Sequence, residues 1–333
     1  ENSMATYREV KGYSVKSVAG DPANIKEGQI WYNSNAKSIK VVPLIQAWSS
    51  GGNLNTARKS TQGCGTLTAG LCFGGNTGAP VKNETEEYDG TSWTEQNNLN
   101  TARYEAGGSG TQTAGLMAGG SPGSNESPPG HTEEYNGTSW SEQNNLNTHR
   151  YTQGGVAMSG VQTASIMVGG ASNPPGPRVN NTENYDGSSW TNGTAFPSVI
   201  SSGVMVGTQT AGFYISGNNG SSITSTANYD GSSWTTGAAV NTARQECGGT
   251  GSQTLAIVNH GQSPGASPAA LVSTELYNGS SWSASSNSAT PRQNGASASV
   301  QTNTASFYAG GTGPLDTTEE WVSAATTRSV DVS

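Results

Sequence analysis

Short runs of small and apolar residues recur along the chain, separated by turns rich in glycine, asparagine and serine. In the segment 101–147 this pattern predicts four short strands, at about 103–109, 114–119, 132–136 and 139–144. The Asn136-Gly137 step falls between the last two and supplies the positive φ angles that a tight hairpin requires. The segment is therefore expected to form one four-stranded antiparallel sheet.

The same segment is one copy of a repeat. The phrase Tyr-(Asp/Asn)-Gly-(Thr/Ser)-Ser-Trp occurs five times intact, and its second half occurs once more around residue 48, so that the tryptophans lie 44 to 50 residues apart. A period of this length, made of short strands and glycine turns, is typical of β-propeller blades. We therefore expect an all-β, six-bladed β-propeller with four-stranded blades. Its repeated aromatic residues are Trp48, Tyr88, Trp93, Tyr135, Trp140, Tyr185, Trp190, Tyr229, Trp234, Tyr277, Trp282 and Trp321. Because they recur in every copy, we expect them to pack between blades rather than to bind a ligand.

The last copy predicts how the ring closes. Trp321 occupies its tyrosine position and no fourth strand is expected after it, so the strand Ile45–Ser50 is expected to complete this blade. Such closure removes an exposed strand edge. The expected organisation is an N-terminal β appendage at 1–44 (a docking element or a cap) that contains a hairpin, a propeller at 45–323 and a C-terminal tail at 324–333.

The composition argues against several classes of partner and site. The chain has 333 residues, of which 11% are charged, and a formal net charge of −8. No cluster of Lys and Arg is present, so a nucleic-acid partner is not expected. Cys64, Cys72 and Cys247 are too scattered for a disulfide framework and are expected to be buried thiols. We expect no signal peptide, no transmembrane segment and no membrane insertion.

One charged pattern follows the repeat. An arginine opens the first strand of five copies, and a glutamate precedes the aromatic residue of the same five: Arg58 and Glu86, Arg103 and Glu133, Arg150 and Glu183, Arg244 and Glu275, Arg292 and Glu319. A ring of arginines near a propeller mouth would suit an anionic glycan or carboxylate. The fourth copy lacks the arginine and has Ala227 in place of the glutamate. Joint loss favours structural ion pairs, because one buried charge without its partner is costly.

Binding is predicted from loop variation. The loops between the second and third strands differ in every copy, whereas the Asp-Gly and Asn-Gly hairpins are nearly identical. Variation on one face of a repetitive scaffold is how binding surfaces are commonly built; the alternative is that these loops are merely tolerated. The candidate partner-loop residues are Asn76, Pro122, Pro128, Pro174, Pro175, Asn219, Pro264 and Pro314.

Two resemblances add expectations. The Gly-Gly pairs that end the second strands, at 74–75, 119–120, 169–170 and 310–311, with Tyr and Trp downstream, resemble the kelch repeat; Gly217-Asn218 and His260-Gly261 depart from it. The stretches 21–24 and 27–34, which include Gly-Gln-Ile-Trp-Tyr-Asn, and the phrases Asn-Thr-Ala-Arg and Gly-Thr-Gln-Thr-Ala, look like those of kelch-like structural proteins of marine tailed phages. This resemblance implies a virion component of the tail or its fibres, made in the host cytoplasm.

Catalysis is not expected. His131, His149 and His260 lie in different repeats with no metal-ligand spacing, and the Asp-Gly phrase does not match the sialidase Asp-box. We expect no catalytic residues, no metal and no cofactor. The expected function is a non-enzymatic virion protein whose partners are other virion proteins or a host surface glycan. The alternatives are a cellular or secreted carbohydrate-binding propeller, and an oxidase or glycosidase, which would require a metal or an acidic pair in the mouth.

Overall fold

The computed structural model describes residues 15–123, 130–151, 155–172, 176–263, 270–299, 302–325 and 328–330, which form strands and loops without a helix. The chain divides into two compact units. One unit comprises residues 47–322, and the other comprises residues 1–46 and 323–333. Within the described residues, no helix offers the long apolar stretch that a bilayer crossing needs.

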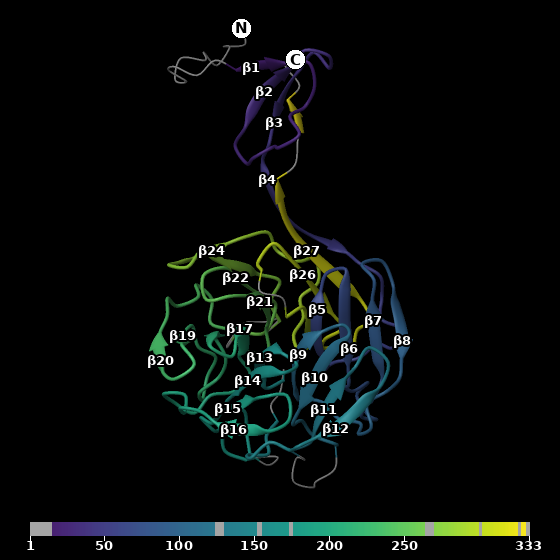
Figure 1. Cartoon of the computed structure of the whole chain (residues 1–333), viewed down its shortest axis with the longest axis vertical. Helices are drawn as coiled ribbons and strands as arrows, with labels where there is room; N and C mark the ends of the chain where they lie inside the picture. The colour runs from purple at the N-terminus through teal and green to yellow at the C-terminus, as the bar shows by residue number, and fades with distance from the viewer. Residues whose placement is uncertain are drawn as a thin grey trace. The chain divides into compact units, whose positions relative to one another are not determined.

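The larger unit contains six four-stranded sheets, the blades of a propeller (Figure 1). Blade one comprises β5 (Gln62–Thr66), β6 (Ala69–Phe73), β7 (Thr85–Tyr88) and β8 (Trp93–Gln96). Blade two comprises β9 (Gly107–Thr111), β10 (Ala114–Ala118), β11 (Thr132–Tyr135) and β12 (Trp140–Gln143). Blade three comprises β13 (Ala157–Val161), β14 (Ala164–Val168), β15 (Thr182–Tyr185) and β16 (Trp190–Asn192).

The second half of the ring follows the same order. Blade four comprises β17 (Val204–Thr208), β18 (Ala211–Ile215), β19 (Thr226–Tyr229) and β20 (Trp234–Thr236). Blade five comprises β21 (Gly248–Gly251), β22 (Ala256–Asn259), β23 (Thr274–Tyr277) and β24 (Trp282–Ala284). Blade six comprises β25 (Ala296–Ser297), β26 (Ala305–Ala309), β27 (Thr318–Ala325) and β4 (Leu44–Ser50).

The six-bladed ring and its closure confirm the fold expected from the repeat. Each first strand contacts the first strand of the next blade, and β25 contacts β5, so the ring is complete. In blade six the order is β25-β26-β27-β4, with the outer strand coming from the N-terminal side of the chain. The Trp48 and Trp321 rings lie with their centroids 5.6 Å apart. The first strands begin later than the sequence predicted, at Gly107 rather than 103 in blade two, because the residues before them form the connection described below.

Glycine is required where the second strands end. Gly74 and Gly119 have φ angles of 64° and 68°, and a side chain there would meet a carbonyl oxygen of the next blade at 2.6 and 2.4 Å. Blades four and five place Ser216 and His260 at this position, with φ of 62° and 53°. The structural equivalent of the double glycine in blade four is thus Ser216-Gly217, not Gly217-Asn218.

The smaller unit is a four-stranded sheet in the order β1-β2-β3-β28. β2 (Ile30–Asn33) and β3 (Ser38–Val41) pair antiparallel, as a hairpin at this place requires. β1 (Lys16–Val18) pairs parallel with β2, and β28 (Arg328–Val330) pairs with β3. Residues expected to form a C-terminal tail therefore supply the end of β27 and a strand of this sheet.

Asp21 organises the smaller unit. Its Oδ1 accepts hydrogen bonds from Trp31 Nε1 at 3.1 Å and from Asn33 Nδ2 at 2.8 Å. The Asn33 bond is the largest influence on the Asp21 carboxyl and lowers its pKa. Trp31 and Asn33 are both buried. The phrase Gly-Gln-Ile-Trp-Tyr-Asn is therefore the packed centre of this unit.

The tyrosines and tryptophans of the repeat lie between blades. The Nε1 atoms of Trp48, Trp93, Trp140 and Trp190 donate at 2.9 Å to the threonine that opens the third strand of the preceding blade, which is Thr274, Thr318, Thr85 or Thr132. Trp234 and Trp282 donate instead to the backbone oxygens of Thr194 and Ala238. The hydroxyls of Tyr135 and Tyr185 donate at 3.0 Å to the preceding blade's Glu87 and Glu134. These contacts give the aromatic residues a structural role.

A tryptophan pair tests this role. Trp140 is 6% exposed and bonded to Thr85, whereas Trp234 is only partly buried. We expect Trp140→Ala to lower the free energy of unfolding by about 3–5 kcal/mol, because it leaves a large cavity and an unpaired threonine hydroxyl. Trp234→Ala is the matched control with a clearly smaller loss. Denaturant unfolding measures both, and equal losses would contradict the inter-blade packing of Trp140.

Candidate functional site

Residues in left-handed backbone conformation form the inner rim of the propeller mouth. They lie two positions after each arginine of the repeat, or after its replacement in blade four, and precede the first strands. The described members are Ser60, Glu105, Ser202, Glu246 and Asn294, with φ between 52° and 61°. The sixth member by register, Thr152, lies outside the described residues. We call this set the belt.

Backbone hydrogen bonds join successive members of the belt. The amide of Glu105 donates to the carbonyl oxygen of Ser60 at 3.1 Å, and that of Ser60 donates to Asn294 at 2.7 Å. The amide of Asn294 donates to Glu246 at 3.2 Å, and that of Glu246 donates to Ser202 at 2.7 Å. Each bond crosses from one blade to the next, so the belt fixes the width of the mouth.

Two basins open at the belt. One has a volume of about 390 Å³ and is lined by Tyr104, Tyr151, Arg178, Asn218 and Gln245 among others. The other has a volume of about 500 Å³ and includes Lys59, Asn76, Gln262, Gln293 and Thr312. Tyr104, Glu105 and Glu246 line both basins and therefore stand where the basins meet. The lining is polar, which suits a hydrated or hydroxyl-rich ligand rather than an apolar one.

The two belt glutamates are the buried acids of the mouth. Glu105 is 7% exposed and Glu246 is 2% exposed. Burial is the main cause that raises the pKa of Glu105 to about 7, and repulsion from Glu246 adds to it, while Lys59 acts in the opposite direction. Burial also raises the pKa of Glu246, against hydrogen bonds from amide side chains. Gln262 Nε2 donates to Glu246 Oε1 at 2.9 Å. The mouth thus holds an acidic pair of the kind that a glycosidase would require.

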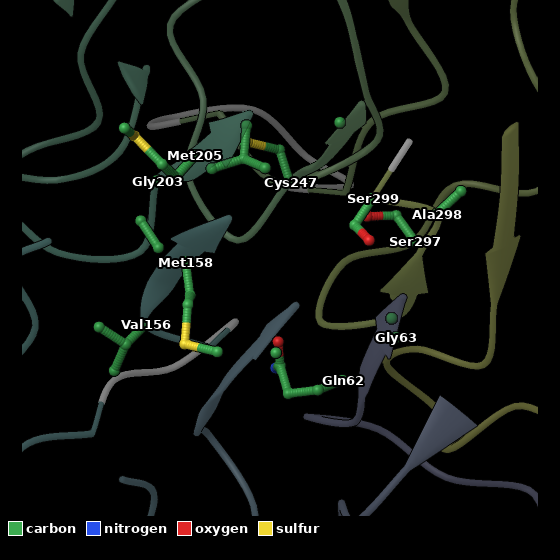
Figure 2. A pocket seen from close by; sticks show the side chains of 15 residues that line it. Gln62, Gly63, Val156, Met158, Gly203, Met205, Cys247, Ser297, Ala298 and Ser299 are labelled. Carbon is green, nitrogen blue, oxygen red and sulfur yellow. The ribbon is translucent and has the colours of Figure 1, made fainter. Parts of the chain in front are cut away.

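A separate small cavity of about 50 Å³ lies among the first strands and the residues just before them (Figure 2). Gln62, Met158, Met205 and Cys247 surround it, together with glycines from several first strands. A space of this size holds only a few water molecules. All three cysteines are free and buried, and burial raises the pKa of the Cys247 thiol to about 11.

The structure brings each predicted Arg–Glu pair together inside its own blade. The Nη2–Oε distances are 2.6 Å for Arg58–Glu86, 3.0 Å for Arg103–Glu133, 2.8 Å for Arg150–Glu183 and 2.7 Å for Arg244–Glu275, and Arg292 contacts Glu319 closely. All five arginine side chains are fully buried. They are therefore out of reach of a ligand in the mouth.

Four of the five arginines also clamp the base of a variable loop at both ends, whereas Arg103 is bonded at one end only, to the carbonyl oxygen of His131 at 3.1 Å. Arg150 Nη1 donates to the carbonyl oxygen of Gly169, where β14 ends, and to that of Asn181, where β15 begins, at 3.1 and 2.8 Å. The equivalent atoms of Arg58, Arg244 and Arg292 make the same two bonds in their blades. Both ends of the loop are thus held while its middle is free to differ.

The sequence pattern did not reveal a third residue, an asparagine that bonds to the glutamate of the pair. Asn147, three residues before Arg150, donates through its backbone amide and its Nδ2 to Glu183 Oε2, at 2.8 and 3.0 Å. Asn55, Asn100 and Asn241 do the same in their blades. The recurring Asn-Thr-Ala-Arg phrase carried this signal, because its asparagine keeps a fixed offset from the arginine.

Blade four shows what replaces the pair. Ile200 occupies the arginine position and is fully buried beside Ala227, Phe196 and Tyr214. The Tyr214 ring packs on Phe196 with centroids 4.9 Å apart. An apolar group of similar volume can replace a buried ion pair without loss of stability.

The candidate partner-loop residues differ in position and in exposure. Asn76 lines one basin and is buried, with its backbone paired to Lys59. Asn219 is exposed in the loop of blade four, and Pro122 and Pro314 are partly buried. Pro128, Pro174, Pro175 and Pro264 lie outside the described residues. Backbone bridges such as Tyr104–Ser121 and Gln245–Gln262 join these loops to the connections between blades, so both lie on one face, which we call the loop face.

One of the histidines, His260, is a packing residue of blade five. The described residues contain no group of three or more His, Cys, Asp or Glu side chains arranged to hold a metal. His260 is fully buried, stacks on Tyr308 with centroids 4.1 Å apart, and has its Nε2 3.6 Å from Glu319 Oε2. Burial lowers the pKa of His260 to about 4. Its side chain is therefore neutral at neutral pH.

The belt was also missed, although its register was visible. It lies at a fixed offset of two from the arginines, and its residue types change from copy to copy. The sequence does not indicate that these residues adopt the left-handed backbone conformation, which turns their side chains to the mouth.

A double-mutant cycle tests the ion pairs, with blade four as the template. We expect Arg150→Ile and Glu183→Ala each to destabilise the protein by about 3–5 kcal/mol, because each leaves a buried charge unpaired. The double variant should lose much less than the sum of the two. Free energies of unfolding from denaturant titration measure the coupling, and additive losses would show that the charges do not act as a pair.

The burial of His260 predicts that the stability of the protein depends on pH. Its pKa is below that of an unfolded histidine, so the unfolded state binds more protons between about pH 6.5 and 4. Stability is present above that window and is lost as the pH falls through it, by roughly 3 kcal/mol in total. His260→Gly, which restores the glycine of other blades, should flatten this part of the profile. Thermal unfolding across pH 4–7 measures this profile. If stability changes with pH equally in the wild-type protein and in His260→Gly, His260 is not the group responsible.

Comparisons with known proteins agree with the fold. No family model matches the chain. No curated protein sequence matches it either. Among solved structures, that of YjhT, a kelch-like β-propeller, is similar with a TM-score of 0.63 and 13% identity, over 83% of this chain and 96% of that chain. At this identity the likeness shows the fold alone, and the chain is a β-propeller of kelch-like architecture.

Proposed function

We propose that the protein is a non-enzymatic structural and binding component of a tailed-phage virion, which presents its loop face to other virion proteins or to a host surface glycan. The observation that carries the proposal is the contrast between a repeated scaffold and a loop face that differs in every blade. The belt, the basins and the variable loops all lie on this face, whereas the opposite hairpins repeat the same turn.

The arginine clamps support this role. Because Arg58, Arg150, Arg244 and Arg292 hold both ends of their loops, the sequences of those loops can change without disturbing the blades that carry them. A repeated scaffold with clamped loops lets a binding surface change faster than the fold. Tyr104 and Tyr151 add amphipathic aromatic surface beside the amide side chains of the basins, which suits the hydroxyls and apolar faces of a sugar.

The smaller unit supports the virion setting. The phrase that resembles phage structural proteins forms its packed centre, through Asp21, Trp31 and Asn33. Both termini of the propeller run into this unit, through β4 and β27. We propose that it attaches the propeller to a neighbouring virion protein.

A glycoside hydrolase is the second candidate, because Glu105 and Glu246 form an acidic pair in the mouth. Hydrolysis needs one carboxyl held as an acid and the other held ionised. Here burial raises the pKa of both, and amide groups rather than a cation surround Glu246, which favours binding over catalysis. The third candidate, a cellular or secreted carbohydrate-binding propeller, would use the same basins outside a virion.

Two linked measurements test the proposal. Mass spectrometry of purified particles is expected to find the polypeptide. Fluorescent protein is then expected to bind host cells or a glycan array, and Asn219→Arg combined with Tyr104→Ala should abolish binding, since both residues are on the loop face. Thr138→Arg, in an exposed turn of the opposite face, is the matched control that keeps binding.

Absence of the polypeptide from particles would refute the virion role. Retained glycan binding in that case would favour the cellular carbohydrate-binding alternative. Turnover of glycosides that is lost in Glu105→Gln would instead establish the hydrolase. Equal binding by the loop-face and control variants would show that the loop face is not the contact surface.

A further inference from the structure

Five asparagines of the chain are followed directly by glycine: Asn136, Asn192, Asn219, Asn278 and Asn294. Asparagine is a chemically labile residue. At such a step the backbone amide nitrogen of the glycine can attack the side-chain carbonyl carbon, Cγ, of the asparagine, and glycine has no Cβ to obstruct the approach. The five steps differ in the hydrogen bonds that the reacting atoms make, so the fold decides which of them react.

The glycine amide nitrogen is held by a hydrogen bond at three of the five steps. The reaction requires this nitrogen to lose its proton, so a bond that holds the proton opposes it. These bonds run from Gly193 to the carbonyl oxygen of Thr182 at 2.8 Å, from Gly220 to Asn218 Oδ1 at 2.8 Å and from Gly295 to the hydroxyl of Tyr308 at 2.9 Å. Among the described residues, no acceptor is bonded to the amide of Gly137 or to that of Gly279. The attacking nitrogen is therefore available after Asn136 and Asn278.

The carbonyl group under attack is activated at the same two steps. Asn136 Oδ1 accepts hydrogen bonds from the backbone amides of Thr138 and Ser139, both at 2.9 Å. Asn278 Oδ1 accepts the equivalent two bonds in blade five, at 3.0 and 2.9 Å. Attack on Cγ places negative charge on this oxygen, and a pair of preorganised backbone amides stabilises charge that develops there. Each hairpin thus supplies an available nucleophile and a polarised carbonyl group.

Three other hairpins show that this oxygen position accommodates negative charge. They carry an aspartate where blades two and five carry asparagine: Asp89, Asp186 and Asp230. Each aspartate accepts the same pair of backbone bonds, and for Asp186 these bonds are the main cause that lowers the carboxyl pKa to about 2. The following glycine has a φ of 86° or 93° in the asparagine hairpins and of 91° to 94° in the aspartate hairpins. A carboxylate therefore fits this turn without a change of backbone.

We propose that Asn136 and Asn278 are sites of spontaneous deamidation in the folded protein. The nitrogen of Gly137 forms a bond to Asn136 Cγ while the bond from Cγ to Nδ2 breaks. The proton that the glycine nitrogen loses is returned through water to Nδ2, which leaves as ammonia, and a cyclic succinimide remains. Water then opens the ring at one carbonyl carbon to give aspartate, or at the other to give isoaspartate. The same steps at Gly279 modify Asn278, and water is the only co-reactant.

The modification changes the charge on the side of the propeller opposite the loop face. Each conversion adds one negative charge, so the formal net charge falls from −8 to −10 when both sites have reacted. All five hairpins of the Tyr-to-Trp phrase then carry a carboxylate. The protein therefore becomes heterogeneous in charge with age. This proposal does not depend on the proposed function, because the reaction needs only the folded chain and water.

Peptide mapping by mass spectrometry, after incubation of the full-length protein at neutral and at mildly alkaline pH, tests the proposal. We expect aspartate and isoaspartate to accumulate at Asn136 and Asn278 roughly tenfold faster than at the other three steps, the factor that one hydrogen bond supplies. The rate should rise with pH, because the glycine nitrogen must lose its proton. The matched control is the protein unfolded in urea, in which all five steps should react at similar rates.

A variant moves the reaction to a protected step. Asn218→Ala removes the acceptor that holds the amide of Gly220, so we expect deamidation at Asn219 to become roughly tenfold faster in the folded protein, with an unchanged rate at Asn136. The melting temperature verifies that this variant is folded. Equal conversion at all five steps of the folded protein would overturn the proposal. Reaction at Asn136 and Asn278 only after unfolding would do the same, and so would an unchanged rate at Asn219 in the variant.

Discussion

The buried arginine–glutamate pair is the interaction on which the propeller's mouth depends. Its guanidinium joins three pieces of one blade: the end of the second strand, the start of the third strand, and the connection from the previous blade. In blade three these contacts run from Arg150 to Gly169, Asn181 and Glu183. Asn147 completes the same cluster from the connection. Because the charges are out of water, the loss of one partner is costly, and in blade four both partners are absent together.

The consequence for function is geometric. Two residues after the clamp the chain enters the left-handed region, and there it meets the next blade through a backbone hydrogen bond. The arginine thereby positions the belt residue, and the belt sets the mouth. Blade four keeps the belt at Ser202 although Ile200 replaces the arginine, because Ile200 packs in an apolar cluster with Phe196 and Ala227. Apolar packing can therefore position a belt residue as well as an ion pair can.

This arrangement separates stability from recognition. Repeated tryptophans join the blades: four of them bond to a threonine side chain, as Trp140 does to Thr85, and two bond to backbone oxygens. The belt and the loops carry the residues that do not repeat. A change of side chain at Glu105 or Asn219 alters the surface available for binding on the loop face and leaves the aromatic contacts between blades in place. The smaller unit has its own centre at Asp21, so changes there are equally independent of the mouth.

Sequence by itself determined the elements whose cause is local or repeated. The period of the tryptophans gave the six blades, the Asn-Gly and Asp-Gly steps gave the hairpins, and the joint absence of arginine and glutamate in the fourth copy gave the ion pairs. Closure through residue 48 followed because the last copy lacked its fourth strand. The strand at 328–330 was missed, because its partner β3 is almost the whole chain away and three residues carry no pattern of their own.

Only the tertiary structure decided the site. The left-handed turn at Glu105 is stabilised by a bond to Ser60 in another blade, and no propensity of glutamate predicts it. The opposition of Glu105 and Glu246 follows from ring symmetry, which places residues 141 positions apart at the same axis. Their burial, and hence their raised pKa values, depends on neighbouring blades that come together only when the ring closes. Local sequence specifies blades, whereas the chemistry at the mouth arises from the ring that the blades make together.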